Sequence, residues 1–202
     1  MKIAELKLAR QRLVDLSPEI AAHCQRVSQV AVDLARRHGA DRERVAWAAL
    51  IHDLARPMPP EELRTLAGVY SLPLDPVEQE MPLLLHGRVG AEILKRDFSV
   101  TDAPLLEAVA WHTTGRGGMD LLGKVLFLAD KIEPHKLASH PPLKEVERLA
   151  QEDLDRAILE FYRWQVSRFL ERNAFLHPAL VEARNYLLKD LGEVSSFASG
   201  AP

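Results

Sequence analysis

The sequence predicts an all-α protein. Leu and Ala dominate its apolar residues, whereas aromatic residues make up only 6% of the chain. This bias favours helix over strand, because Ala and Leu have high helix propensity and strands are enriched in β-branched and aromatic residues. No clear run of alternating apolar and polar residues lies between turn signals, so no strand is expected.

The termini of the first helices can be read from the residue types. A first helix is expected over Ile3–Leu16. Ser17 is then a good N-cap with Pro18 at the first helical position. The second helix is expected to end near Arg37, because a glycine, Gly39, follows shortly after.

Prolines interrupt the chain after the third helix, which is expected to start at Asp41 and continue through Leu54. Three prolines between Arg56 and Pro60 remove backbone donors and fix φ, so this segment must be irregular. The stretches Leu72–Pro82 and Pro134–Pro142 are also expected to be loops. The remaining helices are expected at Glu61–Val69, Leu84–Lys95, Ala103–His112, Met119–Ile132, Pro142–Leu149, Asp153–Asn173 and Pro178–Leu191.

Composition excludes several classes of protein. The chain has 202 residues, 47% of them hydrophobic, and a net charge of −3 without a polybasic block, so neither nucleic acid nor an anionic membrane is an expected partner. Its one cysteine, Cys24, cannot form an internal disulfide, and the charged N-terminus lacks the apolar core of a signal peptide. We expect a cytoplasmic protein, with homodimerisation through the C-terminal helices left open.

Four histidines and two aspartates lie in unusual surroundings. Each sits within or at the end of an apolar helical segment, where an imidazole or a carboxylate is costly to bury without a partner. The six residues are His23, His52, Asp53, His86, His112 and Asp130. A lone inward histidine is more often a hydrogen-bonded core residue, and an acidic residue at a helix end is often a cap. Six such residues on five segments favour a site for Fe, Mn, Co, Ni or Zn, which bind imidazole and carboxylate together.

The spaced residues resemble a known family. The order H…HD…D is the signature of the HD-domain metal-dependent phosphohydrolases, and the flanking residues resemble its YqeK-type branch. The segments that carry the resemblance are HCQRV (23–27), LIHDLAR (50–56), LHGRVGA (85–91), WHTTGR (111–116) and LADKIEP (128–134). The resemblance implies a helical bundle enclosing a metal site, with residues 18–191 as the HD domain. Residues 1–17 are expected to form a separate N-terminal helix, and residues 192–202, which have little to pack against, are expected to be a disordered tail.

The resemblance also implies an activity and a set of ligands. Members of this branch cleave diadenosine tetraphosphate symmetrically to two ADP, using two metal ions that are commonly iron, with Mn, Co or Ni as alternatives. By motif, one ion would be held by His23, His52, Asp53 and Asp130. The second would be held by Asp53, His86 and His112, so that Asp53 bridges the two ions and is a catalytic residue. Two departures from the family pattern, Cys24 for Ser and Arg56 for Lys, keep the residues small and cationic respectively.

Several residues near these motifs have the chemistry to bind the phosphates of a polyphosphate. They are Arg26, Arg56, Arg88, Thr113, Thr114, Gly115, Arg116 and Lys131. Arg56 and Lys131 are the strongest candidates, with a role in catalysis as well, because each directly adjoins a metal motif. Each cation alone could equally be a solvated surface charge, and the H-T-T-G turn could equally be a helix stop.

Two other functions remain open at the level of the sequence. The same fold could hydrolyse another nucleotide, such as a nucleoside monophosphate, a dNTP or an alarmone. A nucleotide sensor that keeps the fold without turnover is the third option, although sensors of this kind usually lose a ligand and all six are present here.

Overall fold

The computed structural model describes residues 3–194, and every regular element among them is a helix. The all-α prediction is therefore confirmed. The elements are α1 (Ile3–Leu16), α2 (Pro18–His38), α3 (Arg42–Ile51), α4 (Pro60–Val69), α5 (Pro76–Glu80), the 3-10 helix η1 (Pro82–Leu85), α6 (His86–Arg96), α7 (Ala103–Trp111), α8 (Leu121–Lys131), α9 (Pro134–Ser139), α10 (Leu143–Ala150), α11 (Leu154–Glu171) and α12 (Pro178–Asp190). The expected disorder of the tail concerns chiefly residues 195–202, which lie outside the described residues.

Capping determines where the first helices begin and end. The Ser17 hydroxyl accepts a hydrogen bond from the Ile20 amide at 3.3 Å, as an N-cap should. Gly39 ends α2 with a φ of 73°, a left-handed conformation that glycine adopts at little cost. Asp41 caps α3 by accepting from two amides, so the expected starts of α2 and α3 are both correct.

Two segments expected to be loops contain short helices. Pro76–Glu80 forms α5, because Asp75 and Glu78 make a reciprocal capping box around its first turn. Pro134–Ser139 forms α9, whose N-cap is the side chain of Glu133. In both helices proline occupies the first position, where its missing N–H costs nothing. Treating these prolines only as helix breakers was therefore wrong.

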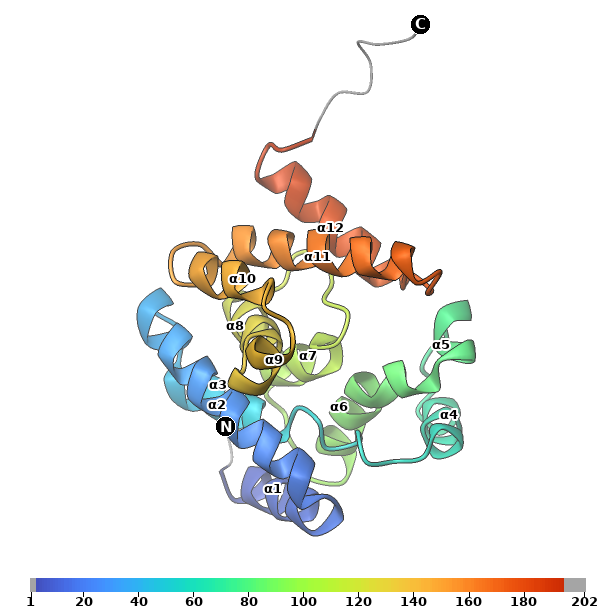
Figure 1. Cartoon of the computed structure of the whole chain (residues 1–202). Coiled ribbons are helices and arrows are strands. Elements are labelled where there is room, and N and C mark those ends of the chain that lie inside the picture. The colour runs from blue at the N-terminus through green and yellow to red at the C-terminus, as the bar shows by residue number, and fades with distance from the viewer. Residues whose placement is uncertain (1–2, 195–202) are drawn as a thin grey trace, which may run out of the picture.

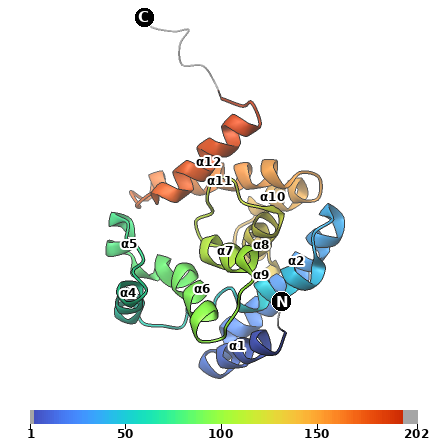
Figure 2. The same ribbon diagram turned by 180° about the vertical axis from the view of Figure 1, so that it is seen from behind.

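The core lies between α2, α3, α7 and α8, which pack against one another (Figure 1). Helices α4, α5 and α6 lie to one side of it, and α10, α11 and α12 cover one end, as the reverse view also shows (Figure 2). Helix α1 belongs to the same core, since Leu6, Ala9 and Leu13 are fully buried in it. Among residues 3–194, no helix is long and apolar enough to cross a membrane.

Candidate metal centre

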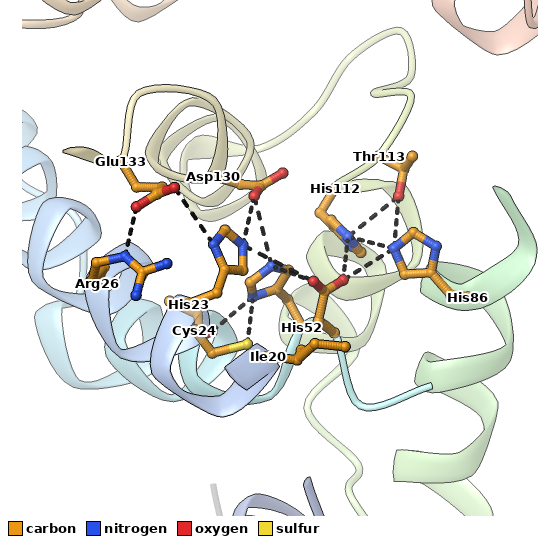
Figure 3. Close-up of polar contacts among 12 residues, drawn as sticks. Ile20, His23, Cys24, Arg26, His52, His86, His112, Thr113, Asp130 and Glu133 are labelled. Atoms are coloured by element: carbon orange, nitrogen blue, oxygen red, sulfur yellow. Dashed lines mark hydrogen bonds and ion pairs between the residues drawn. The ribbon is translucent and has the colours of Figure 1, made fainter. Parts of the chain in front are cut away.

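Five segments bring the six predicted metal ligands into one cluster (Figure 3). His23 lies on α2 and Asp130 near the end of α8, whereas His86 is the first residue of α6. His52 and His112 each follow directly after a helix, α3 and α7, and Asp53 is the next residue after His52. All of these residues except His23, which lies within α2, are thus at or beside the end of a helix.

Asp53 lies between two groups of histidines. Its Oδ1 is 3.0 Å from Nε2 of His86 and 3.3 Å from Nε2 of His112. Its Oδ2 faces the other way, 3.6 Å from Nε2 of His52 and 4.0 Å from Nε2 of His23. The two oxygens of the Asp53 carboxylate therefore face two different groups of histidines.

Asp130 completes the group that contains His23 and His52. Its Oδ1 lies 3.1 Å from Nε2 of His23 and 3.9 Å from Nε2 of His52. Two ammonium groups also contact this carboxylate, Lys131 on Oδ2 at 2.8 Å and Lys136 on Oδ1 at 2.6 Å.

The backbone sets the tautomers of three histidines. Nδ1 of His52, His86 and His112 lies 2.7, 2.5 and 2.8 Å, respectively, from the carbonyl oxygen of the residue three positions earlier. Each Nδ1 must therefore carry the proton, which leaves the Nε2 lone pair directed into the cluster.

The lone pairs directed into the cluster would be stabilised by a cation. Nε2 of His86 and Nε2 of His112 lie 3.0 Å apart, so two acceptors face each other. Nε2 of His52 is buried and has no hydrogen-bond partner among the described residues. Both features are costly for a buried polar atom and are relieved by a shared metal ion.

Electrostatics favours the protonation states that metal binding needs. Burial lowers the pKa of His52 to about 4 and also lowers that of His112, which keeps both rings neutral. Burial opposes ionisation of Asp130, but Lys131 and Lys136 hold its pKa well below the usual range. Neutral imidazoles and ionised carboxylates are the forms that bind metals.

Two groups of potential ligands fit this description within residues 3–194. One is His23, His52 and Asp130, and the other is Asp53, His86 and His112. Cys24 forms a third group with His52 and Asp53, but its thiol lies 3.7 Å from Nδ1 of His52, the nitrogen turned away from the cluster. Burial raises the pKa of Cys24 strongly, so it is a buried thiol rather than a thiolate ligand.

A cavity of about 560 Å³ opens onto this cluster. Arg56, Lys131 and Thr113, three of the residues expected to bind phosphate, line it. The Arg56 amide donates to the Asp53 carbonyl at 2.9 Å, but its guanidinium has no hydrogen-bond or ion-pair partner in the described part of the chain and is available to a ligand.

Three of the four expected phosphate-binding arginines, Arg26, Arg88 and Arg116, pair with carboxylates. Arg26 donates to Glu133 at 2.8 Å, and Glu133 in turn faces Nδ1 of His23 at 3.7 Å (Figure 3). Arg88 lies outside this cavity and donates to both oxygens of Glu78, at 2.9 and 2.8 Å. In this structure Arg26 and Arg88 join helices to one another.

The residues after His112 in the H-T-T-G-R turn also differ in whether they reach the cluster. Thr113 does, with its hydroxyl 3.2 Å from Nε2 of both His86 and His112, whereas Thr114, Gly115 and Arg116 do not line the cavity. The hydroxyl of Tyr162 donates to the Thr114 carbonyl at 3.1 Å. Gly115 has a φ of 70°, and a Cβ there would lie only 1.9 Å from that hydroxyl. Arg116 pairs with Glu107 at 2.6 Å, away from the cavity.

Several cavity residues could not be predicted from the sequence. Lys136 is one of them, because the segment that carries it was expected to be a loop with no defined direction. The others are Glu19, Ile20, Met81, Leu83 and Leu84. Met81 and Leu83 are exposed apolar side chains on the cavity wall, a feature that only the folded chain displays.

The cluster coincides with a known family pattern. A model of the HD domain family matches residues 20–135, which include all six ligand candidates. The chain belongs to the HD domain family. Among curated relatives, this HD-domain protein is 34% identical over 166 residues to a symmetrical bis(5'-nucleosyl)-tetraphosphatase of Bacillus subtilis, covering 82% of this chain and 88% of the relative. A protein of the same name from Halalkalibacterium halodurans is 33% identical, with 82% and 87% covered.

A solved structure has the same fold. The crystal structure of a protein from Clostridium acetobutylicum, described as a predicted HD superfamily hydrolase involved in NAD metabolism, matches with a TM-score of 0.86 and 31% identity. The match covers 91% of this HD-domain protein and 97% of the other chain. The helical bundle around the cluster is therefore the HD-domain fold.

Proposed function

We propose that this HD-domain protein is a metal-dependent phosphohydrolase that cleaves diadenosine tetraphosphate symmetrically, consuming one water and releasing two ADP. The observation that carries the proposal is the Asp53 carboxylate, whose two oxygens face two separate histidine groups at the floor of a cation-lined cavity. The choice of substrate is supported by the names of the relatives in Bacillus subtilis and Halalkalibacterium halodurans.

Two divalent ions would be held at the cluster. His23, His52, Asp53 and Asp130 would hold one, and Asp53, His86 and His112 would hold the other. The nitrogen-rich donor set fits iron, with Mn, Co and Ni as alternatives, and is too rich in nitrogen for Mg or Ca. Divalent ions at such a site supply a water nucleophile near neutral pH and offset charge on a phosphoryl oxygen.

The cations of the cavity would position the phosphates. Arg56 has a free guanidinium that can bind a phosphate through two parallel hydrogen bonds. Lys131 is buried and donates to the His112 carbonyl at 3.1 Å as well as to Asp130, so its charge is fixed beside the cluster. Positioning and charge are what phosphoryl transfer requires of a protein.

The apolar lining of the cavity suits a nucleoside. Its apolar residues are Ile20, Met81, Leu83 and Leu84, and Met81 and Leu83 are 45% and 36% exposed. A base that covers these side chains removes apolar surface from water. Substrate would then lie with its base against these side chains and its inner phosphates over the cluster.

Chromatography of the products tests this function. The metal-depleted chain is reloaded anaerobically with Fe²⁺ or Mn²⁺ and incubated with diadenosine tetraphosphate. ADP alone is the expected product. ATP plus AMP would contradict symmetrical cleavage, and faster hydrolysis of a nucleoside monophosphate, a dNTP or an alarmone in parallel assays would favour the alternative substrates.

A further inference from the structure

Lys136 occupies the carboxylate oxygen that completes one ligand group. Its ammonium lies 2.6 Å from Oδ1 of Asp130. The same oxygen is 3.1 Å from Nε2 of His23 and 3.9 Å from Nε2 of His52. Lys136 thus supplies positive charge at the oxygen where a divalent ion would supply it.

The second lysine on this carboxylate, Lys131, is fixed in a way that Lys136 is not. Lys131 is buried, donates to the His112 carbonyl and lies 5.0 Å from the centre of the Phe127 ring. The side chain of Lys136 is 36% exposed, and within residues 3–194 its ammonium contacts only Asp130. Lys136 can therefore leave Asp130 without breaking another hydrogen bond or ion pair of its ammonium within residues 3–194.

We propose that a divalent ion displaces Lys136 from Asp130 and that the freed ammonium then binds a phosphate group in the cavity. An ion on Oδ1 of Asp130 would repel an ammonium held at the same oxygen, strongly so in a site with little water. Lys136 lines the cavity and has a flexible four-carbon stem, so a phosphate there is within its reach. The phosphate part of this inference rests on the proposed function, whereas the competition with metal does not.

Arg56 gives a matched comparison. It lines the same cavity, but it does not contact Asp130. Arg56→Gln should therefore weaken phosphate binding alone. Lys136→Gln should change two affinities in opposite directions, with tighter metal binding and weaker phosphate binding. A lysine that only neutralises the surface would change neither.

Two titrations test this inference. Mn²⁺ is titrated into the metal-depleted chain and followed by electron paramagnetic resonance, and inorganic phosphate is then titrated into the Mn²⁺-loaded chain by calorimetry. For Lys136→Gln we expect the Mn²⁺ dissociation constant to fall about tenfold and the phosphate constant to rise about tenfold, the change that one charge-assisted contact supplies. Arg56→Gln should leave Mn²⁺ binding within about twofold of wild type, and Lys136→Arg, which keeps the charge, should shift both constants less than Lys136→Gln does.

The two titrations test the displacement of Lys136 by metal and its binding of phosphate separately. Unchanged or weaker Mn²⁺ binding by Lys136→Gln would overturn the displacement, and unchanged phosphate binding would overturn the second role. Lys136→Met serves as the replacement if thermal unfolding shows that Lys136→Gln is not folded. If both constants shift as expected but wild type does not cleave diadenosine tetraphosphate, the proposed function fails and this inference stands.

Discussion

Three histidines owe their orientation to a single local rule. His52, His86 and His112 each follow directly after a helix, so Nδ1 can donate to a carbonyl of the last helical turn. Carbonyls of that turn have no intrahelical partner or only a shared one. The same hydrogen bond satisfies the helix end and directs Nε2 toward the cluster. The position of a histidine relative to its helix is thus part of the site.

Arg56 is the residue whose replacement should separate substrate binding from metal binding. Arg56→Ala removes one charge-assisted contact to phosphate, about 1.5–3 kcal/mol. We expect kcat/KM for diadenosine tetraphosphate to fall roughly tenfold to 150-fold, with metal content unchanged by elemental analysis. Unchanged kinetics would mean that Arg56 is only a surface charge.

The metal-ligand candidates could be predicted from the sequence, whereas the ion-pair partners of Arg26 and Arg88 could not. The six ligand candidates could be found because each is a polar residue in an apolar run, a property of the local chain. The roles of Arg26 and Arg88 depend on Glu133 and Glu78, and Glu133 lies 107 positions away from Arg26. No local pattern indicates such a partner.

At the scale of elements, short helices and turns place the site. Helices α5 and α9 form because proline starts them and a side chain caps them. Both were expected to be loops, since proline alone does not distinguish a helix start from a helix stop. Helix α9 places Lys136 at the cavity, and α5 places Glu78 beside Arg88. Because both helices were expected to be loops, the ion pairs of Lys136 and Glu78 could not be predicted.

The turn after α7 should be sensitive to a single methyl group. Gly115→Ala forces a left-handed φ on alanine and places Cβ against the Tyr162 hydroxyl. We expect a loss of about 1–3 kcal/mol in the free energy of unfolding and a lower kcat, because Thr113 moves with the turn. Denaturant unfolding and steady-state kinetics measure both.

The matched control is Gly39→Ala, where φ is also positive but no atom lies within 4 Å of the added Cβ. It should cost stability without lowering kcat. The double variant Gly115→Ala, Tyr162→Phe should recover part of the lost stability. No recovery would show that the hydroxyl is not the obstacle.

Glu78 should make the packing of α5 depend on pH. Burial would raise its pKa, but His177, the Asp75 amide and Arg88 lower it to about 2, against an ordinary value of 4.5. A carboxyl whose pKa is lowered by folding stabilises the fold fully above its unfolded value, and this stabilisation is lost as the pH falls toward 2.

Glu78→Gln is therefore expected to lower the free energy of unfolding at pH 7 by about 2–4 kcal/mol. The difference from wild type should be constant down to about pH 5 and shrink below it. Urea unfolding at several pH values measures this difference, with the exposed Glu80→Gln as the control. A difference that does not shrink in acid would contradict the ionic role of Glu78.

At the scale of the whole molecule, one core supports both the N-terminal helix and the cluster. Leu6, Ala9 and Leu13 of α1 are fully buried in that core, and the Arg10 guanidinium donates to the Ala21 carbonyl on α2 at 2.9 Å. We propose that α1 unfolds together with the rest of the HD domain rather than as a separate unit.

Leu13→Ala tests this proposal. The substitution leaves a cavity in the core and should cost about 2–5 kcal/mol, while calorimetry still shows one transition at a lower Tm. Leu8→Ala, at a side chain of the same helix that is 63% exposed, should change Tm little. Two separate transitions would show that α1 is an independent appendage.

Asp53 is proposed to join two metal sites, and elemental analysis of anaerobically purified protein decides whether it does. Wild type should contain two divalent ions per chain. His86→Ala should keep one ion, because all four residues proposed to hold that ion, His23, His52, Asp53 and Asp130, remain. Asp53→Ala should lose both ions together with turnover, whereas the exposed control Asp33→Ala should lose neither. An Asp53→Ala protein that still holds two ions per chain would contradict the account.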